Sequence, residues 1–156
     1  METLNTNFQE NVVAEIKLSY SHKIKPSLRP KIKCSQHASE ILRENWDKDS
    51  LGFVEEFKVM LVSRCNQVIG ICKIGIGGTT CVTVDLKLVF ATAIKGNASS
   101  IILAHNHPSG NLSSSEQDRR LTQKIKEGCK IFDITLLDHI ILTEEAYYSF
   151  ADEGLL

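Results

Sequence analysis

The hydrophobic positions of this chain form short segments with either the two-residue period of a β-strand or the 3.6-residue period of an α-helix. Segments rich in apolar and β-branched residues are predicted to be strands, and they are 12–20, 53–62, 67–76, 99–105, 131–137 and 139–142. The polar residues 64–66 separate two of these segments and predict a hairpin between them.

Helical periodicity marks segments that lie between or after the predicted strands, namely 35–45, 85–95, 116–127 and 144–150. Ser35 and Asp85 are suitable N-cap residues for the first two helices, while Gly96 and Gly128 are expected to end the second and the third. Residues 47–52 are expected to form a turn. Because helices alternate with strands, the pattern predicts an α/β fold.

A chain of 156 residues is expected to form one domain. Residues 1–10 are polar and are predicted to be a frayed N-terminus, so the single domain is expected at 11–156. No apolar run is long enough to span a membrane, and the N-terminus lacks the basic and apolar regions of a signal peptide. The five cysteines include no Cys-x-x-Cys pair, so a zinc site made of thiolates is not expected. Because no secretion signal is seen, the protein is expected in the reducing cytoplasm.

The net charge of −1 does not suggest a nucleic-acid-binding protein, but the charge is unevenly distributed. Six basic residues and no acidic ones occur between Lys17 and Lys33. This segment predicts either weak binding to a polyanion such as a nucleic acid or simply a solvated strand and loop.

Two histidines end the apolar strand predicted at 99–105. Alternate side chains of a strand share a face, so His105 and His107 should point at one common location at the carboxyl edge of the sheet. Pro108 and Gly110 then turn the chain, and a helix that begins near Ser115 would place Asp118 in its first turn.

Two imidazoles and one carboxylate are the protein ligands of a catalytic zinc site, whose fourth position is left open. The spacing of His105, His107 and Asp118 therefore predicts one Zn²⁺ per chain. The alternative is structural, because Ser115 and Asp118 also fit the Ser-x-x-Asp pattern of a capping box. A zinc deaminase is disfavoured, since the chain lacks the Pro-Cys-x-x-Cys segment of such enzymes.

The segment His105-Asn106-His107-Pro108-Ser109-Gly110, continued by Ser115-Glu116-Gln117-Asp118, resembles the JAB/MPN metalloprotease motif and, more closely, its RadC-like branch. The resemblance runs from about Glu55 to the C-terminus and includes Leu137-Asp138-His139 and Tyr148-Ser149-Phe150-Ala151. It implies a mixed β-sheet flanked by helices, in the deaminase-like α/β architecture. It also implies zinc ligation by the two histidines and the aspartate.

In this family an upstream glutamate activates the water, and the segment from Glu55 to Leu61 matches that pattern at Glu55. Strand alternation places Glu55 on the face of Phe57 and leaves Glu56 on the other face as a solvated acid. Ser115 matches the family serine that helps to hold the oxyanion, although its hydroxyl could equally be a helix cap.

The sequence departs from the family at Ser114, where proline is common, and this change could loosen the loop. His139 is expected to be structural or to support a ligand rather than to bind the metal. RadC-like chains often carry an N-terminal helix-hairpin-helix segment, and nothing in this sequence resembles one.

These features predict a zinc-dependent hydrolase of amide or isopeptide bonds that acts on a peptide or protein substrate. The resemblance also brings a DNA-repair label. Two alternatives stay open, namely a non-catalytic MPN-like module that binds partners and a DNA-associated protein or nuclease that acts through Lys17 to Lys33.

Overall fold

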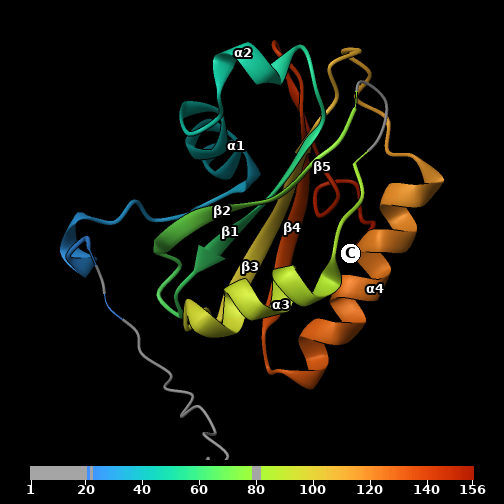
Figure 1. Ribbon diagram of the computed structural model, residues 1–156. Helices are drawn as coiled ribbons and strands as arrows, with labels where there is room; N and C mark the ends of the chain where they lie inside the picture. Colours follow the sequence, from blue (N-terminus) through green and yellow to red (C-terminus); the bar gives the residue numbers. More distant parts are fainter. Residues whose placement is uncertain (1–20, 22, 79–81) are drawn as a thin grey trace, which may run out of the picture.

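The residues described by the computed structural model, which are 21, 23–78 and 82–156, form one mixed sheet of five strands (Figure 1). The strands are β1 (Glu56–Val62), β2 (Val68–Ile76), β3 (Ser100–Asn106), β4 (Thr135–Leu142) and β5 (Tyr147–Ser149), in the spatial order β2-β1-β3-β4-β5. β3 and β4 are parallel, whereas the other neighbouring strands are antiparallel. The predicted α/β fold with a mixed sheet is confirmed, while the predicted strand at 12–20 and the predicted frayed end at 1–10 lie outside the described residues.

Helices cover both faces of the sheet (Figure 1). They are α1 (Ser35–Glu44), α2 (Lys48–Leu51), α3 (Leu86–Lys95) and α4 (Glu116–Ile131), and a short 3-10 helix spans Pro26–Leu28. α1 packs on one face, whereas α3 and α4 pack on the other. No helix within the described ranges is long and apolar enough to cross a membrane.

β3 lies at the centre of the sheet, and all seven of its residues are buried. Ile102 and Ala104 pack into the core beneath α1, while Ile101 and Leu103 pack into the core beneath α3 and α4. Each fully buried isoleucine or leucine side chain of this kind contributes about 1.5–3 kcal/mol. The strand is therefore rigidly held, and the polar side chains at its carboxyl end have little freedom to move.

The parallel pairing of β3 with β4 requires a crossover connection, and α4 provides it. The connection from Asn106 to α4 runs along the carboxyl edge of the sheet, so α4 begins beside the end of β3. His105 at the end of β3 and Asp118 in the first turn of α4 consequently meet at this edge.

Of the two predicted N-cap residues, Asp85 is confirmed and Ser35 is not. Asp85 caps α3 by accepting a hydrogen bond from the Lys87 N–H at 2.9 Å, and Gly96 follows the last helical residue, as predicted. Ser35 was expected to cap α1, but it is the first helical residue, and its hydroxyl donates to the Asp152 carboxylate at 2.5 Å. The predicted turn at 47–52 contains the four-residue α2.

Gly128 does not end α4, which continues to Ile131, so that prediction was wrong. A Cβ atom at Gly128 would collide with the ring of Phe90 from α3. The glycine therefore allows α3 and α4 to approach closely, rather than terminating the helix.

The C-terminal part of the sheet also differs from the prediction. One continuous strand, β4, replaces the two strands expected at 131–137 and 139–142. The helix expected at 144–150 is instead the edge strand β5, whose Ser149 lies opposite Ile140 of β4. Pairing with β4 satisfies the backbone groups of both strands, and this gain overrides the local helical pattern.

β1 begins at Glu56 rather than at residue 53, because the N–H groups of Phe53 and Val54 both bond back to the Ser50 carbonyl in the turn after α2. Glu55 itself is held in line with the strand. Its N–H donates to the Gly78 carbonyl at 2.9 Å, and its carbonyl accepts from the Gly77 N–H at 2.8 Å.

Glu56 is buried rather than solvated, so the expectation for this residue was wrong. Only 2% of its side chain is exposed, and its carboxylate lies 2.8 Å from Lys73 Nζ and 3.2 Å from Lys58 Nζ. Lys58 also lies 4.0 Å from the ring centre of Trp46. Burial raises the pKa of Glu56, but the hydrogen bonds and charges of the two lysines outweigh burial and lower the pKa below its usual 4.5.

Replacing Glu56 by glutamine should therefore destabilise the fold, because Lys58 would be left as a buried charge without a counter-ion. We expect Glu56→Gln to lower the free energy of unfolding by roughly 3 kcal/mol at pH 7 in urea denaturation, the lower end for a broken buried ion pair. Because the pKa of Glu56 in the folded state is lowered below 4.5, the stability that Glu56 contributes is fully present above pH 4.5 and is lost as the pH falls through the folded-state pKa. The difference in the free energy of unfolding between the wild type and Glu56→Gln should therefore shrink at low pH.

The matched control is Glu116→Gln, since Glu116 pairs with Arg120 at 3.0 Å on the exposed surface of α4. That change should cost less than about 1 kcal/mol. Equal effects of the two substitutions would contradict a structural role for the Glu56 ion pair.

Candidate metal centre

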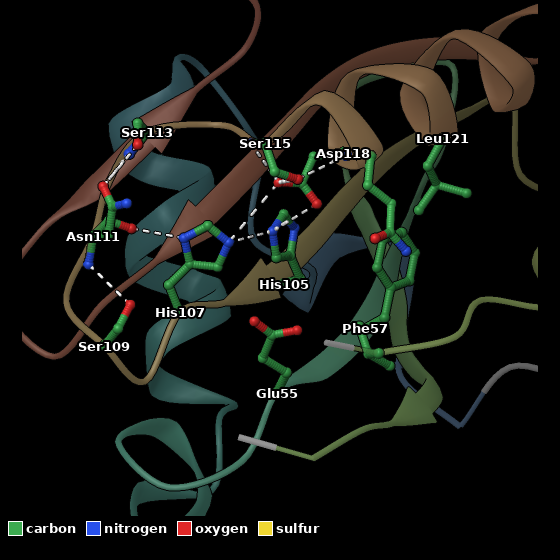
Figure 2. A pocket seen from close by; sticks show the side chains of 12 residues that line it. Glu55, Phe57, His105, His107, Ser109, Asn111, Ser113, Ser115, Asp118 and Leu121 are labelled. Atoms are coloured by element: carbon green, nitrogen blue, oxygen red, sulfur yellow. Dashed lines mark hydrogen bonds and ion pairs between the residues drawn. The ribbon is translucent and has the colours of Figure 1, made fainter. Parts of the chain in front are cut away.

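Two histidines lie at the carboxyl end of β3 and face the α4 side of the sheet (Figure 2). His105 alternates with Leu103 and is 2% exposed. His107 follows the strand, and its N–H donates to the Leu142 carbonyl at 2.8 Å. The Nε2 atoms of His105 and His107 are 3.0 Å apart, so the predicted convergence of the two imidazoles is what the structure shows.

Asp118 of α4 completes the group, and the structure reconciles its two predicted roles. Its Oδ2 atom closes the capping box, accepting from the Ser115 N–H at 2.8 Å and from the Ser115 hydroxyl at 2.6 Å. Its Oδ1 atom lies 3.4 Å from His105 Nε2. Oδ2 therefore caps the helix and also lies 3.9 Å from His107 Nε2, while Oδ1 faces His105.

The tautomer of His105 follows from hydrogen bonds behind it. The Thr122 hydroxyl donates to the Asp118 carbonyl at 2.7 Å, so it accepts from His139 Nδ1 at 2.6 Å. His139 Nε2 is then an acceptor, and the Nδ1–H of His105 donates a hydrogen bond to it at 2.8 Å. Nε2 of His105 is left with a lone pair directed at the site.

His107 reaches the same state by a different contact. Its Nδ1 donates to the Asn111 carbonyl at 2.6 Å, because a carbonyl can only accept. The turn that brings Asn111 into place includes Gly110, whose φ of 78° lies in the left-handed region that favours glycine. Nε2 of His107 is therefore also a lone pair that points into the site.

Two lone pairs and a carboxylate oxygen at such short separations repel one another unless a cation lies among them. The ligand atoms of His105, His107 and Asp118 all lie within 4.8 Å of one another and could hold a metal ion. Tetrahedral ligands of zinc, bound at about 2.0–2.1 Å, are about 3.4 Å apart. The observed 3.0 and 3.4 Å separations fit that spacing.

Burial keeps the imidazoles of His105 and His139 neutral. It lowers the pKa of His105 to about 4, although the nearby Asp118 charge acts in the opposite direction. It lowers the pKa of the fully buried His139 well below 6.5, and the neighbouring His105 and His107 add to this effect. Neutral imidazole is the form that binds metal, so the site is prepared for an ion at neutral pH.

Glu55 lies on the same face as Phe57, as predicted from strand alternation. Phe57 pairs with His105 across the antiparallel β1–β3 ladder, so Glu55 is brought opposite His107. Figure 2 shows its carboxylate pointing towards the two imidazoles. The pKa of Glu55 is raised mainly by burial, with a lowering effect from His107 and a raising effect from Asp118.

A pocket of ≈ 290 Å³ opens over this group. Its polar wall contains all five residues singled out from the sequence, namely Glu55, His105, His107, Ser115 and Asp118. The apolar side chains of Phe57, Val82 and Leu121 form part of the remaining wall. The site is therefore accessible from outside, and it offers both polar and apolar contacts to a bound molecule.

Sequence reasoning did not identify several residues that support the site. His139 was expected to be structural or supporting, and it does contact a proposed ligand, but Thr122, Asn111 and Asn106 were not singled out. A buried asparagine directly between two histidines was a usable signal, because a buried amide must find partners. Ser114, expected to loosen the loop, accepts a hydrogen bond from Arg119 Nε at 3.0 Å.

Comparison with known proteins places the chain in context. The family model described as a RadC-like JAB domain matches residues 32–155. A UPF0758 protein of Flavobacterium johnsoniae is 45% identical over 101 residues, which are 65% of this chain and 44% of that protein. A UPF0758 protein of Desulfitobacterium hafniense is 34% identical over 134 residues, 84% of this chain and 56% of that protein. The chain spans about half the length of the curated relatives it matches.

The geometry predicts that the purified protein binds about one divalent ion per chain, as a mononuclear open site does. Elemental analysis after dialysis against Zn²⁺ should show this ion, and Zn²⁺ should raise the melting temperature of protein stripped with a chelator. His107→Ala should lose most of the metal yet stay folded, since the imidazole lies at the edge of the pocket. His37→Ala, on α1 at the opposite face, is the control that should keep it. Unchanged metal in both His105→Ala and His107→Ala would show that the site is misassigned.

Proposed function

The chain belongs to the RadC-like JAB domain family, and from this membership and the geometry of its site we propose that it is a zinc-dependent hydrolase of amide or isopeptide bonds. One observation carries the proposal. Two imidazole lone pairs and a carboxylate oxygen converge in an open pocket, directly beside a buried glutamate. A protein that only binds partners has no need of this combination.

Zinc is proposed because two histidines and one carboxylate form the ligand set of catalytic zinc sites that leave one position open. His105, His107 and Asp118 would be the ligands. A bound zinc ion supplies a Lewis acid that polarises a carbonyl and makes water more acidic.

Glu55 is the proposed general base. Its carboxylate points towards the metal ligands, and burial raises its pKa, which strengthens it as a proton acceptor. Glu55 would take a proton from the attacking water and later deliver that proton to the nitrogen of the leaving amine. The same residue therefore serves both halves of the hydrolysis.

Ser115 is proposed to stabilise the oxyanion of the tetrahedral intermediate. Its hydroxyl lines the pocket and donates at present to Asp118 Oδ2. Rotation about one bond would turn this donor towards the substrate, while the Ser115 N–H would keep its own bond to Asp118.

Glu55 is the proposed base but not a proposed metal ligand, so Glu55→Gln tests catalysis separately from metal binding. Glutamine keeps the size of the side chain but cannot accept a proton at neutral pH. Zinc content should be unchanged, whereas hydrolysis should fall by about 10²–10⁴-fold, the usual contribution of a general base. A library screen of peptides and lysine-isopeptides first identifies substrates that the wild type cleaves. The measurement is then the turnover of these substrates by the zinc-loaded variant and wild type.

Glu56→Gln is the matched control, because its side chain leaves the strand on the opposite face. Assayed well below its melting temperature, it should cleave at close to the wild-type rate even though the fold is weakened. A wild-type protein that binds zinc but cleaves no peptide or isopeptide would favour the non-catalytic, partner-binding alternative. Inactivity of Glu56→Gln with full activity of Glu55→Gln would show that the base is wrongly assigned.

Nucleic-acid binding through Lys17 to Lys33 is a second, weaker proposal, and any link to DNA repair would act through this segment. Within its described part, Lys23, Lys25, Lys31 and Lys33 are all exposed. Binding of a short DNA duplex should be weak and should fall steeply with salt, because phosphate contacts release counter-ions. Fluorescence anisotropy at several salt concentrations measures this. Binding that is sequence-specific and persists at high salt would make DNA recognition a main function.

A further inference from the structure

We propose that Asn106 is a positioning residue that holds Glu55 over the metal site. The proposal rests on the hydrolytic function given above, in which Glu55 is the base. It concerns a residue whose side chain touches neither the proposed ligands nor the pocket. Asn106 would act only through the backbone of the segment that carries Glu55.

Asn106 is the last residue of β3 and lies between the two proposed histidine ligands. Strand alternation turns its side chain to the opposite face from His105, towards the segment between α2 and β1. The residue is fully buried. An amide in such a place requires hydrogen-bond partners, and it finds three of them in one short stretch of chain.

Those three bonds surround Glu55. The amide nitrogen of Asn106 donates to the Leu51 carbonyl at 2.7 Å and to the Val54 carbonyl at 2.8 Å. The amide oxygen accepts from the Glu56 N–H at 2.7 Å. The residues immediately before and after Glu55 are thus both tied to the strand that carries the histidines.

The three hydrogen bonds of the Asn106 side chain lie where the backbone pairing of β1 with β3 stops. β1 and β3 pair residue by residue from Val62 and Ser100 up to Phe57 and His105. At the next position Glu56 bonds to the side chain of Asn106 instead of to its backbone. The chain can therefore leave the strand for the turn after α2, yet Glu55 keeps the orientation that the ladder would have imposed.

The other side of Glu55 is held by the two residues that follow β2. The Glu55 N–H and carbonyl bond to Gly78 and Gly77, so Glu55 has no free backbone group. With its neighbours fixed by Asn106 and its own backbone fixed by the glycines, the remaining freedom is in its side chain. That side chain is directed to the metal ligands (Figure 2).

Asparagine is the side chain that fits this arrangement. It supplies two donors and one acceptor on a short stem, which are the groups that two carbonyls and one N–H require. Aspartate would turn a carboxylate towards two carbonyl oxygens. Alanine would leave all three buried backbone groups without this partner, and the segment would be free to shift.

The test places Co²⁺ in the site of this 156-residue chain and measures paramagnetic relaxation of the Glu55 carboxylate carbon by ¹³C NMR, with Glu55→Gln used to assign the signal. In the wild type the relaxation should be strong, because the carboxylate lies beside the ion. In Asn106→Ala it should weaken severalfold, while Co²⁺ affinity stays close to the wild-type value. Asn106→Ser, which keeps one hydroxyl, gives a milder version of the same change and is the variant to use if Asn106→Ala does not fold.

A double-mutant comparison of turnover gives an independent readout. Asn106→Ala should lower kcat with little change in KM, by up to the 10²–10⁴-fold that a general base contributes. In the Glu55→Gln background the same substitution should cause no further loss, since the residue through which it acts has gone. Ser39→Ala is the control, because it removes a buried hydroxyl bonded to Gln36 in α1 and should leave both readouts unchanged.

The outcomes separate the two proposals. If Co²⁺ does not bind, the metal-dependent hydrolytic function itself is wrong. If Glu55→Gln retains full turnover, Glu55 is not the general base, and the positioning role of Asn106 is overturned with it. If Co²⁺ binds and Glu55→Gln is inactive, but Asn106→Ala leaves the relaxation of Glu55 unchanged, the positioning role is overturned. Losses of kcat that multiply in the double variant would likewise show that Asn106 contributes only to the fold.

Discussion

The antiparallel pairing of β1 with β3 is the interaction on which the site depends. It sets Phe57 opposite His105, and every side chain beyond that pair follows from the alternation of the two strands. This register brings Glu55 close to His107 without a direct bond between the two side chains. A slip of one residue would turn Glu56 towards the proposed metal ligands instead. The two hydrophobic layers that bury β3 from both sides make such a slip costly, since it would move apolar side chains to the wrong face.

Hydrogen bonds on the far side of each proposed ligand complete what the register begins. His105 is held by the chain through His139 to Thr122, while His107 is held by the carbonyl of Asn111. Both contacts fix a proton on Nδ1, so the two Nε2 atoms present lone pairs to the same point. Asp118 takes part in both the helix cap and the site, with Oδ2 bonded to Ser115 and Oδ1 facing His105. The capping box and the ligand set are therefore one structure, and the start of α4 is positioned by the same residues that would bind the ion.

Two groups of titratable side chains lie close to each other on opposite faces of the sheet. On the α4 face the imidazoles, Asp118 and Glu55 border a pocket, and their mutual repulsion favours a cation. On the α1 face Glu56 is neutralised by Lys58 and Lys73 and stabilises the fold. Two adjacent glutamates thus have different physical roles, because strand alternation sends their side chains into environments of different charge.

The sequence by itself predicted the α/β class and singled out His105, His107 and Asp118, which could hold a metal ion, together with the neighbouring Glu55. His105, His107 and Asp118 have a spacing that local geometry makes meaningful, and strand alternation needs only neighbouring residues. Tertiary structure decided the rest. β5 is a strand because β4 offers it an edge, Gly128 lies inside α4 because Phe90 packs there, and Glu56 is buried because two lysines meet it. His139 has its side-chain partners 17 and 34 residues away, and Asn106 has its partners 50 or more residues away. Such contacts depend on which strands pair and in what register, and no local pattern in the chain carries that information.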